Sequence, residues 1–124
     1  MPIIKVETNI EASRFPTNFH VHFTALGSEL LQKPQKVIWV VLEADKQLTM
    51  GGTNAPTAVV TVECIGRLKP ELNLAFGTKI EEYFKEFLAI PRDRIVTRFV
   101  SVPALFCQYD GKLHDIGVQY DQDL

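Results

Sequence analysis

The sequence has only two cysteines, Cys64 and Cys107, among its 124 residues. Two thiols are too few for a disulfide scaffold, and they lie too far apart in the chain for a CxxC redox pair or a zinc-binding pair. We therefore expect both to be reduced and buried, which fits a protein made in the cytosol. Glycine and proline, at seven residues each, are too few for collagen or a low-complexity chain.

Long hydrophobic runs and an excess of positive charge are also missing. No apolar run approaches the roughly 20 residues that span a bilayer, and the N-terminus lacks the features of a signal peptide. An extracellular role would therefore need export without a signal peptide. With 13 basic and 15 acidic residues, neither nucleic acid nor a membrane is an expected partner. The 46% of hydrophobic residues suit one globular domain, 1–124, with a sizeable core.

Apolar periodicity predicts two helices and four strands. The first helix, 16–32, rests on Phe15, Phe19, Phe23, Leu26 and Leu30, which follow one another at helical spacing. The second helix opens at Pro70 and ends near Ala89; its expected apolar face consists of Leu72, Phe76, Ile80, Phe84 and Phe87. The predicted strands are 2–8, 36–42, 57–65 and 94–102, and the connection 43–56 has room for one short edge strand.

The two halves of the chain, about 2–42 and 58–102, repeat one pattern of strand, helix and strand. We interpret this as a duplicated βαβ unit, followed by a C-terminal segment, 103–124. Right-handed crossovers would place both helices on the same face of a four-stranded sheet. The stretches Val37–Leu42 and Ala58–Val62 are apolar at consecutive positions, so the second face also needs burial. Another subunit is the expected cover.

Pro2 is the first candidate for chemistry. Removal of Met1 would expose a prolyl secondary amine at the start of an ordered strand. A free α-amino group has an ordinary pKa of about 7.7–8, and desolvation or a nearby cation lowers it toward the value that a general base needs. The alternative is that Met-Pro is a common start with no catalytic meaning, and position alone does not decide between them.

Two cations are further candidates. Lys33 ends the first helix, where it suits the helix dipole and could also meet an anionic substrate group; a solvated lysine is the simpler interpretation. Arg98 lies within an apolar strand, where it needs either a carboxylate partner or a substrate to clamp. His20, His22 and His114 do not have the spacing of a metal site, and no metal or cofactor is expected.

In combination and order, the sequence resembles the macrophage migration inhibitory factor and D-dopachrome tautomerase family over nearly its whole length. The resemblance rests on Met1-Pro2, Thr8-Asn9, Phe15-Pro16, Lys33-Pro34, Gly51-Gly52, Pro56, Cys64-Ile65-Gly66 and the stretch Pro91-Arg92-Asp93-Arg94-Ile95. Within the family, FPTNF and ECIG are most similar to the second type of homologue from parasitic nematodes.

The resemblance implies an α+β fold with a four-stranded mixed sheet, two helices on one face, and a homotrimer with a tautomerase site between subunits. Pro2 matches the family's base, Lys33 its substrate-carboxylate cation, and Ile65 a residue whose main chain contacts a small aromatic keto or enol substrate. It also implies a cytokine that is cytoplasmic and secreted, with a cell-surface receptor as partner.

Some positions depart from the migration inhibitory factor pattern. Val96 replaces a tyrosine, and Arg98 replaces an asparagine and resembles the D-dopachrome tautomerase branch as a substrate-binding residue. Thr57 and Val60 stand where a CxxC pair would be, so thiol oxidoreductase activity is not expected. Phe106 and Tyr109 are candidates for an aromatic pocket wall. A weak tautomerase and a non-catalytic secreted signalling ligand with a vestigial pocket both remain as hypotheses.

Overall fold

The computed structural model describes residues 1–113, which form an α+β fold. The regular elements, in chain order, are β1 (Ile3–Thr8), α1 (Phe19–Leu31), β2 (Trp39–Glu43), β3 (Ala58–Cys64), α2 (Pro70–Leu88), β4 (Ile95–Ser101), β5 (Gln108–Tyr109) and β6 (Lys112–Leu113). Short 3-10 turns lie at η1 (Ala12–Arg14), η2 (Gln35–Val37), η3 (Arg92–Arg94) and η4 (Ala104–Phe106). All four predicted strands and both predicted helices are present, with shifted ends.

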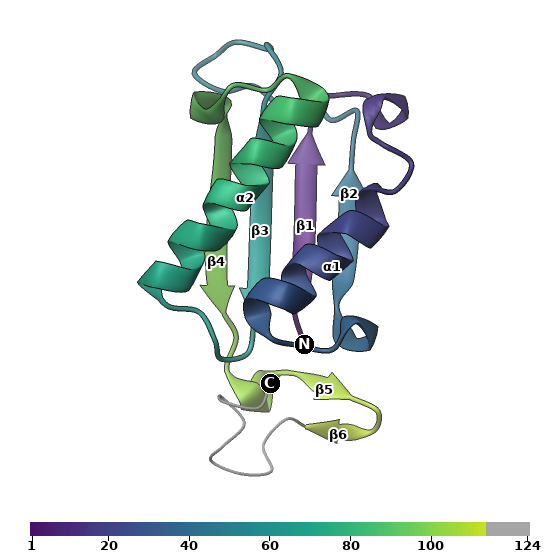
Figure 1. Cartoon of the computed structure of the whole chain (residues 1–124), viewed down its shortest axis with the longest axis vertical. Helices are drawn as coiled ribbons and strands as arrows, with labels where there is room; N and C mark the ends of the chain where they lie inside the picture. The colour runs from purple at the N-terminus through teal and green to yellow at the C-terminus, as the bar shows by residue number, and fades with distance from the viewer. Residues whose placement is uncertain (114–124) are drawn as a thin grey trace.

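The main sheet is mixed, in the order β2-β1-β3-β4. β1 pairs parallel with β2 through α1, and β3 pairs parallel with β4 through α2. The two βαβ units meet where β1 and β3 run antiparallel, so the first strand of the chain lies inside the sheet (Figure 1). This arrangement confirms the predicted four-stranded mixed sheet.

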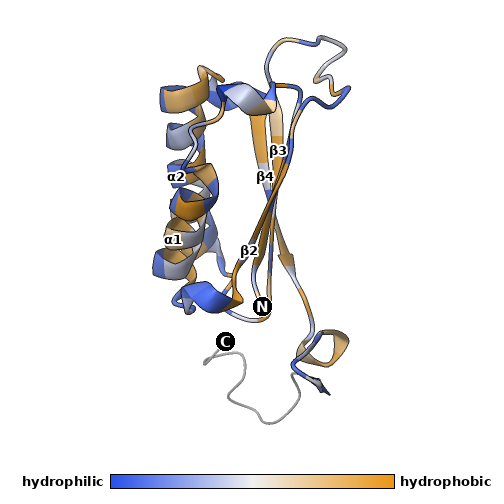
Figure 2. Ribbon diagram, turned by 90° about the vertical axis from the view of Figure 1, so that its right-hand side faces the viewer, coloured by the Kyte–Doolittle hydropathy of each residue, from blue (hydrophilic) through white to orange (hydrophobic). Residues whose placement is uncertain are grey.

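Both helices cover the same face of the sheet, as the repeat predicted (Figure 2). Alternate residues of β1 and β3 point into the layer between helices and sheet, because successive side chains of a strand point to opposite faces. Those fully buried in it are Ile4, Val6, Thr8, Ala58, Val60, Val62 and Cys64. No helix among residues 1–113 lies on the other face, where Trp39, Val41, Val96 and Val100 are exposed.

Helix α1 begins at Phe19 rather than at the predicted residue 16. The Phe19 N–H donates to the Pro16 carbonyl at 3.0 Å, which closes a turn before the helix, so the phenylalanine at 15 enters the core from extended backbone. The buried positions of α1 are Phe19, Phe23, Gly27 and Leu31; the predicted Leu26 and Leu30 are only half-buried.

Gly27 lets α1 approach the sheet closely. A Cβ at this position would lie 2.8 Å from Ile4 Cδ1, which is closer than real carbon contacts allow. Because the helix backbone itself lies against β1, the neighbouring helical positions face away from the deepest part of the core. This explains why Gly27 and Leu31 are buried in α1, in place of the predicted Leu26 and Leu30.

Helix α2 has the predicted length but a different apolar face. Phe76, Ile80 and Phe84 are buried as expected, whereas Phe87 is 48% exposed. Tyr83 and Leu88 take the place that the prediction gave to Phe87. The buried residues Phe76, Ile80 and Phe84 follow one another at four-residue steps, which exceed the 3.6 residues of one turn, so their line winds slowly around the helix. Leu88 is the next residue on this line, and Phe87 lies beside it.

Strand β2 starts at Trp39, three residues later than predicted, because Gln35–Val37 form the 3-10 turn η2 after Pro34. The connection 43–56 contains one isolated bridge, between Met50 and Thr53, instead of an edge strand. The C-terminal segment 103–124 is described only as far as residue 113, where η4 and the hairpin β5-β6 end; His114 lies outside the described residues.

Candidate active site

The start of the chain lies deep in the structure. Pro2 is buried, and its carbonyl accepts a hydrogen bond from the Trp39 N–H at 3.0 Å, one residue before β1. Since β1 is an inner strand, the N-terminus lies between β2 and β3, at the end of the sheet where the antiparallel strand β3 finishes (Figure 1). Met1 is also buried, with 8% of its surface exposed.

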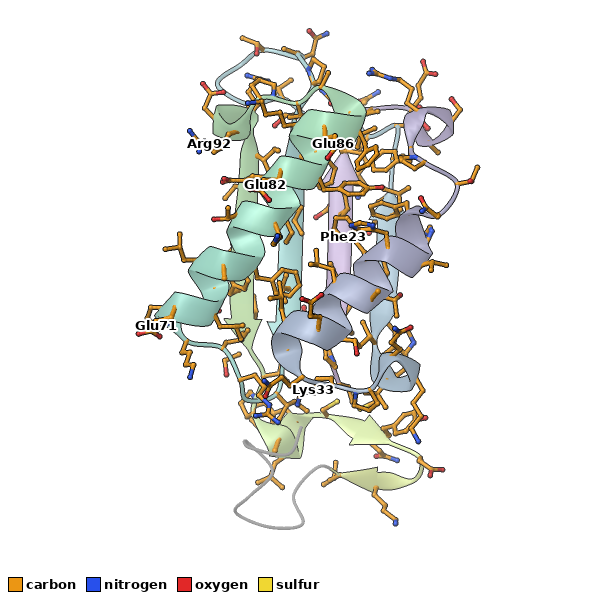
Figure 3. All side chains as sticks on the ribbon, viewed as in Figure 1. Phe23, Lys33, Glu71, Glu82, Glu86 and Arg92 are labelled. Carbon is orange, nitrogen blue, oxygen red and sulfur yellow. The ribbon has the colours of Figure 1, made fainter. Side chains whose placement is uncertain are left out.

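Lys33 arrives at the same end of the sheet from α1 (Figure 3). The helix stops at Gln32, which takes a left-handed conformation (φ 54°), and the Lys33 N–H then donates to the Ser28 carbonyl at 3.3 Å. The lysine is 3% exposed, and its Nζ donates to the Ile65 carbonyl at 3.3 Å. Lysine is rarely buried to this degree without a specific role.

The N-terminal amine and Lys33 influence each other. Burial lowers the pKa of the Met1 amine, and the positive charge of Lys33 lowers this pKa further. Both effects disfavour the protonated amine, so they increase the fraction of neutral amine near neutral pH. Only the neutral form can accept a proton.

An apolar pocket of about 390 Å³ opens beside the amine. Its walls come from β1, β2, the end of β3 and the segment around η4 and β5. The lining residues are Met1, Ile3, Trp39, Val41, Glu63, Ile65, Val102, Phe106, Cys107, Gln108 and Tyr109. Trp39 and Tyr109 meet edge to face, with ring centroids 6.0 Å apart and an interplanar angle of 81°. A flat aromatic molecule suits such walls.

The pocket includes residues that the sequence analysis did not select. Phe106 and Tyr109, the candidates for an aromatic wall, both line it, but neither Trp39 nor Glu63 was selected as a site residue. Cys107 was expected to be buried; it is half-exposed and lines the pocket, whereas Cys64 is fully buried. Burial raises the pKa of the Cys64 thiol.

Three of the four predicted site residues lie at one end of the sheet. Lys33 and Ile65 are joined by a hydrogen bond, and Pro2 follows Met1, whose amine is influenced by the charge of Lys33; of the three, Ile65 alone lines the pocket. Arg98 does not join them within one chain. It is exposed on the outer face of β4, next to Thr61 of β3, and it does not line this pocket.

Residues 1–113 contain no group of three or more histidine, cysteine, aspartate or glutamate side chains arranged to hold a metal ion. Neither helix in that part of the chain is both long and apolar enough to cross a membrane.

The comparisons with known proteins agree with this geometry. A family model described as "Macrophage migration inhibitory factor (MIF)" matches residues 1–114. A macrophage migration inhibitory factor homolog from Trichinella spiralis is 33% identical over 102 residues, which are 82% of this chain and 90% of that one. A D-dopachrome decarboxylase from Mus musculus is 30% identical over 105 residues, 84% of this chain and 89% of that one.

A solved structure of macrophage migration inhibitory factor from Oncomelania hupensis superposes with a TM-score of 0.93 and 43% sequence identity. The match covers 98% of this chain and 86% of that one. The chain therefore belongs to the macrophage migration inhibitory factor family, as its sequence motifs predicted. The Trichinella relative agrees with the expected likeness to nematode homologues.

Proposed function

We propose that this protein is a keto–enol tautomerase of the phenylpyruvate or dopachrome type, which uses the secondary amine of Pro2 as its base once Met1 has been removed. One observation carries the proposal: the N-terminal amine of Met1 is buried close to Lys33 and lines an aromatic pocket, and both its burial and the charge of Lys33 lower its pKa. The same surroundings would act on an amine at Pro2, one residue further along.

The reaction needs only a proton transfer within the site, so no cofactor is proposed. The neutral Pro2 nitrogen removes a proton from the carbon next to the substrate carbonyl, and the electron pair of that C–H bond moves to form the enolate. The protonated amine then returns the proton to the enolate oxygen, which gives the enol. The aromatic ring of the substrate lies between the walls that Trp39, Phe106 and Tyr109 supply.

Lys33 holds the substrate carboxylate and stabilises the charge that develops on the enolate. Its hydrogen bond to the Ile65 carbonyl fixes the side chain in the site before substrate binds. The main chain at Ile65 would contact the substrate on the same side. The lysine therefore has two effects in this proposal, one on the substrate and one on the pKa of the amine.

The proposal includes a homotrimer with one domain, residues 1–124, per subunit. The uncovered sheet face, with Trp39, Val41, Val96 and Val100 exposed, supports it, because exposed apolar faces of this kind are typical of subunit contacts. Arg98 points out from this face and, in the trimer, would reach the pocket of a neighbouring subunit to bind the polar end of the substrate.

The test is tautomerisation of an aromatic keto acid and of a dopachrome ester. The wild-type protein, with Met1 removal verified by mass, is compared with Pro2→Gly and with a form that retains Met1. We expect activity only in the processed wild type, because the other two lack the prolyl amine. Equal turnover by the Met1-retaining form would contradict the amine mechanism.

A signalling ligand with a vestigial pocket is the second candidate, and it is favoured by Val96, which places an apolar side chain where the family pattern has a phenol. This role requires export without a signal peptide and a cell-surface receptor. Saturable binding to immune cells that persists in Pro2→Gly, in a preparation without tautomerase activity, would favour it. Absence of binding to such cells would exclude it.

A further inference from the structure

Directly after Ile65, two consecutive residues have a positive φ, Gly66 at 70° and Arg67 at 72°. The Leu68 N–H donates to the Gly66 carbonyl at 2.9 Å, which closes a γ-turn centred on Arg67. A γ-turn with positive φ is rare and strained for a residue that has a Cβ atom. Glycine would adopt it without strain, so an arginine at this position indicates a use for its side chain.

Within residues 1–113, the guanidinium of Arg67 makes no hydrogen bond or ion pair that explains its position. Its Nε is buried and has no hydrogen-bond partner, while the residue as a whole is half-buried. Arg67 takes part in no ion pair among residues 1–113, so no carboxylate neutralises it there. A partly desolvated, unpaired charge is costly and attracts an anion more strongly than a fully solvated one does.

Arg67 lies in a second hollow, of about 640 Å³. The lining residues are Gly66, Arg67, Leu68, Ser101, Val102, Pro103, Ala104, Leu105 and Phe106. Among residues 1–113, none of the lining residues is acidic, and Arg67 is the only charged one. Val102 and Phe106 also line the pocket at the N-terminus, so the two hollows share a wall. From the described part of the chain, a small anion in the second hollow would meet one cation and no carboxylate in the lining.

We propose that Arg67 forms an oxyanion-binding site, separate from the proposed catalytic pocket, for a ligand that carries a carboxylate or a phosphate group. The terminal nitrogens of the guanidinium donate to two oxygens of this group, the planar geometry for which arginine is better suited than lysine. The strained turn holds the guanidinium of Arg67 in the hollow, and the bound anion neutralises the positive charge of this guanidinium. The site does not depend on the Pro2 mechanism.

The test is a titration of the full chain, followed through the backbone amide NMR signals of Gly66 and Leu68. Inorganic phosphate and acetate are added in separate arms, with sodium chloride at matched ionic strength as the reference. The variants are Arg67→Gln, which removes the charge, and Arg92→Gln, a matched control on the exposed turn η3.

We expect saturable shifts of both amides in the wild type and in Arg92→Gln, and their loss in Arg67→Gln. Saturation by phosphate alone would assign a phosphate ligand, and saturation by both anions a carboxylate-accepting site. Equal saturable shifts in Arg67→Gln would overturn the proposal, because another cation would then bind the anion. Absence of saturation in the wild type with either anion would also overturn it.

Arg67→Gly separates a binding role from a structural one. Glycine relieves the positive φ, so if the guanidinium serves a ligand, this variant melts at a higher temperature than the wild type in chloride. The rise in melting temperature that phosphate gives the wild type is then absent. A melting temperature below that of the wild type in chloride would mean that Arg67 supports the fold, and the proposal would fail.

Discussion

At the scale of single residues, Lys33 is expected to influence the protonation of the amine proposed as the catalytic base. Its charge lowers the pKa of the N-terminal amine, so Lys33→Gln should raise this pKa. The base is active only when neutral, and activity falls as the pH drops through its pKa. The acidic limb of the kcat/KM profile should therefore move to higher pH in Lys33→Gln.

The matched control is Lys36→Gln, an exposed lysine on η2. Its profile should coincide with that of the wild type apart from a small effect of net charge. A Lys33→Gln profile that is lower at all pH values but unmoved along the pH axis would show that Lys33 only binds substrate. In that case burial alone would account for the lowered pKa.

The hydroxyl group of Tyr83 makes no hydrogen bond within residues 1–113. The side chain is 5% exposed and packs against Phe23 at a centroid distance of 4.9 Å, but its hydroxyl is buried without a hydrogen-bond partner. Burial also raises the pKa of this phenol. Tyr83→Phe should raise the free energy of unfolding by about 1 kcal/mol, since it removes an unsatisfied group and keeps the ring.

Urea denaturation measures this change, with Tyr109→Phe as a control whose more exposed hydroxyl should matter little. A clear loss of stability in Tyr83→Phe would reveal a partner for the hydroxyl, such as an ordered water.

The residues of the candidate site were only partly predictable. Pro2 and Lys33 could be selected because an N-terminal imino group and a cation at a helix end have chemistry of their own. Trp39 and Glu63 could not, because they reach the pocket through strand register: both are Cα partners of Ile3, from opposite sides. Register depends on pairing between distant segments, which composition and local periodicity do not contain.

At the scale of the secondary-structure element, the contact between α1 and β1 depends on Gly27. In Gly27→Ala, the gain in helix propensity of about 1 kcal/mol opposes the clash of the new Cβ with Ile4 Cδ1 at 2.8 Å. Overpacking of a buried core costs about 1–3 kcal/mol, so we expect a net loss of stability of about 1 kcal/mol.

A double-mutant cycle tests the cause. Ile4→Val removes Cδ1, so in that background Gly27→Ala should stabilise the protein by up to about 1 kcal/mol. Gly77 on α2 is the matched control, because an added Cβ there meets only Phe99 Cζ, at 4.0 Å. Gly77→Ala should be stabilising in the wild-type background. Additive effects of Gly27→Ala and Ile4→Val would show that the clash is not the reason for the glycine.

Periodicity located every main element but misplaced some ends, and Phe15 shows why. Its ring is buried, and the centroid of this ring lies 5.0 Å from that of Phe19 in an edge-to-face contact. A residue of a helix could be packed into the core in the same way. Phe15 reaches this position from extended backbone, at φ −77° and ψ 142°. A pattern of apolar residues records which side chains are buried and not the backbone that carries them.

Two turn residues, Asn9 and Arg94, have a structural explanation at this scale. The Asn9 side chain donates to the carbonyls of Leu48 and Ala55 and accepts from the Thr57 N–H. Arg94 donates to the carbonyls of Pro56 and Ala55. These residues, which carried part of the family resemblance, hold the long connection between β2 and β3 and take no part in the candidate site.

At the scale of the whole molecule, the exposed sheet face should control assembly. Val96 is 49% exposed on the outer face of β4, and Val96→Glu would place a charge in the proposed subunit contact. We expect this variant to sediment with the mass of one chain and to lose tautomerase activity, whereas the wild type sediments as three chains. Charges buried in an interface without partners are strongly unfavourable.

Val21→Glu is the control, because Val21 is 70% exposed on the outward side of α1. This variant should stay trimeric and active. A wild-type mass of one chain at micromolar concentration would contradict the trimer and the contribution of Arg98 to a neighbouring pocket. The need for a cover on the second face was predictable from the apolar strands, but the number of subunits depends on angles between sheets that one chain's sequence does not specify.

The inner position of β1 also has a consequence for how the protein is made. Met1 is buried and its neighbour Pro2 is bonded to Trp39, so an aminopeptidase can reach the first peptide bond only before the sheet closes. Closure needs β3 and β4, which leave the ribosome after β1 and β2. The time that translation takes to deliver these strands is therefore the interval available for maturation. We expect a chain that folds with Met1 in place to keep it.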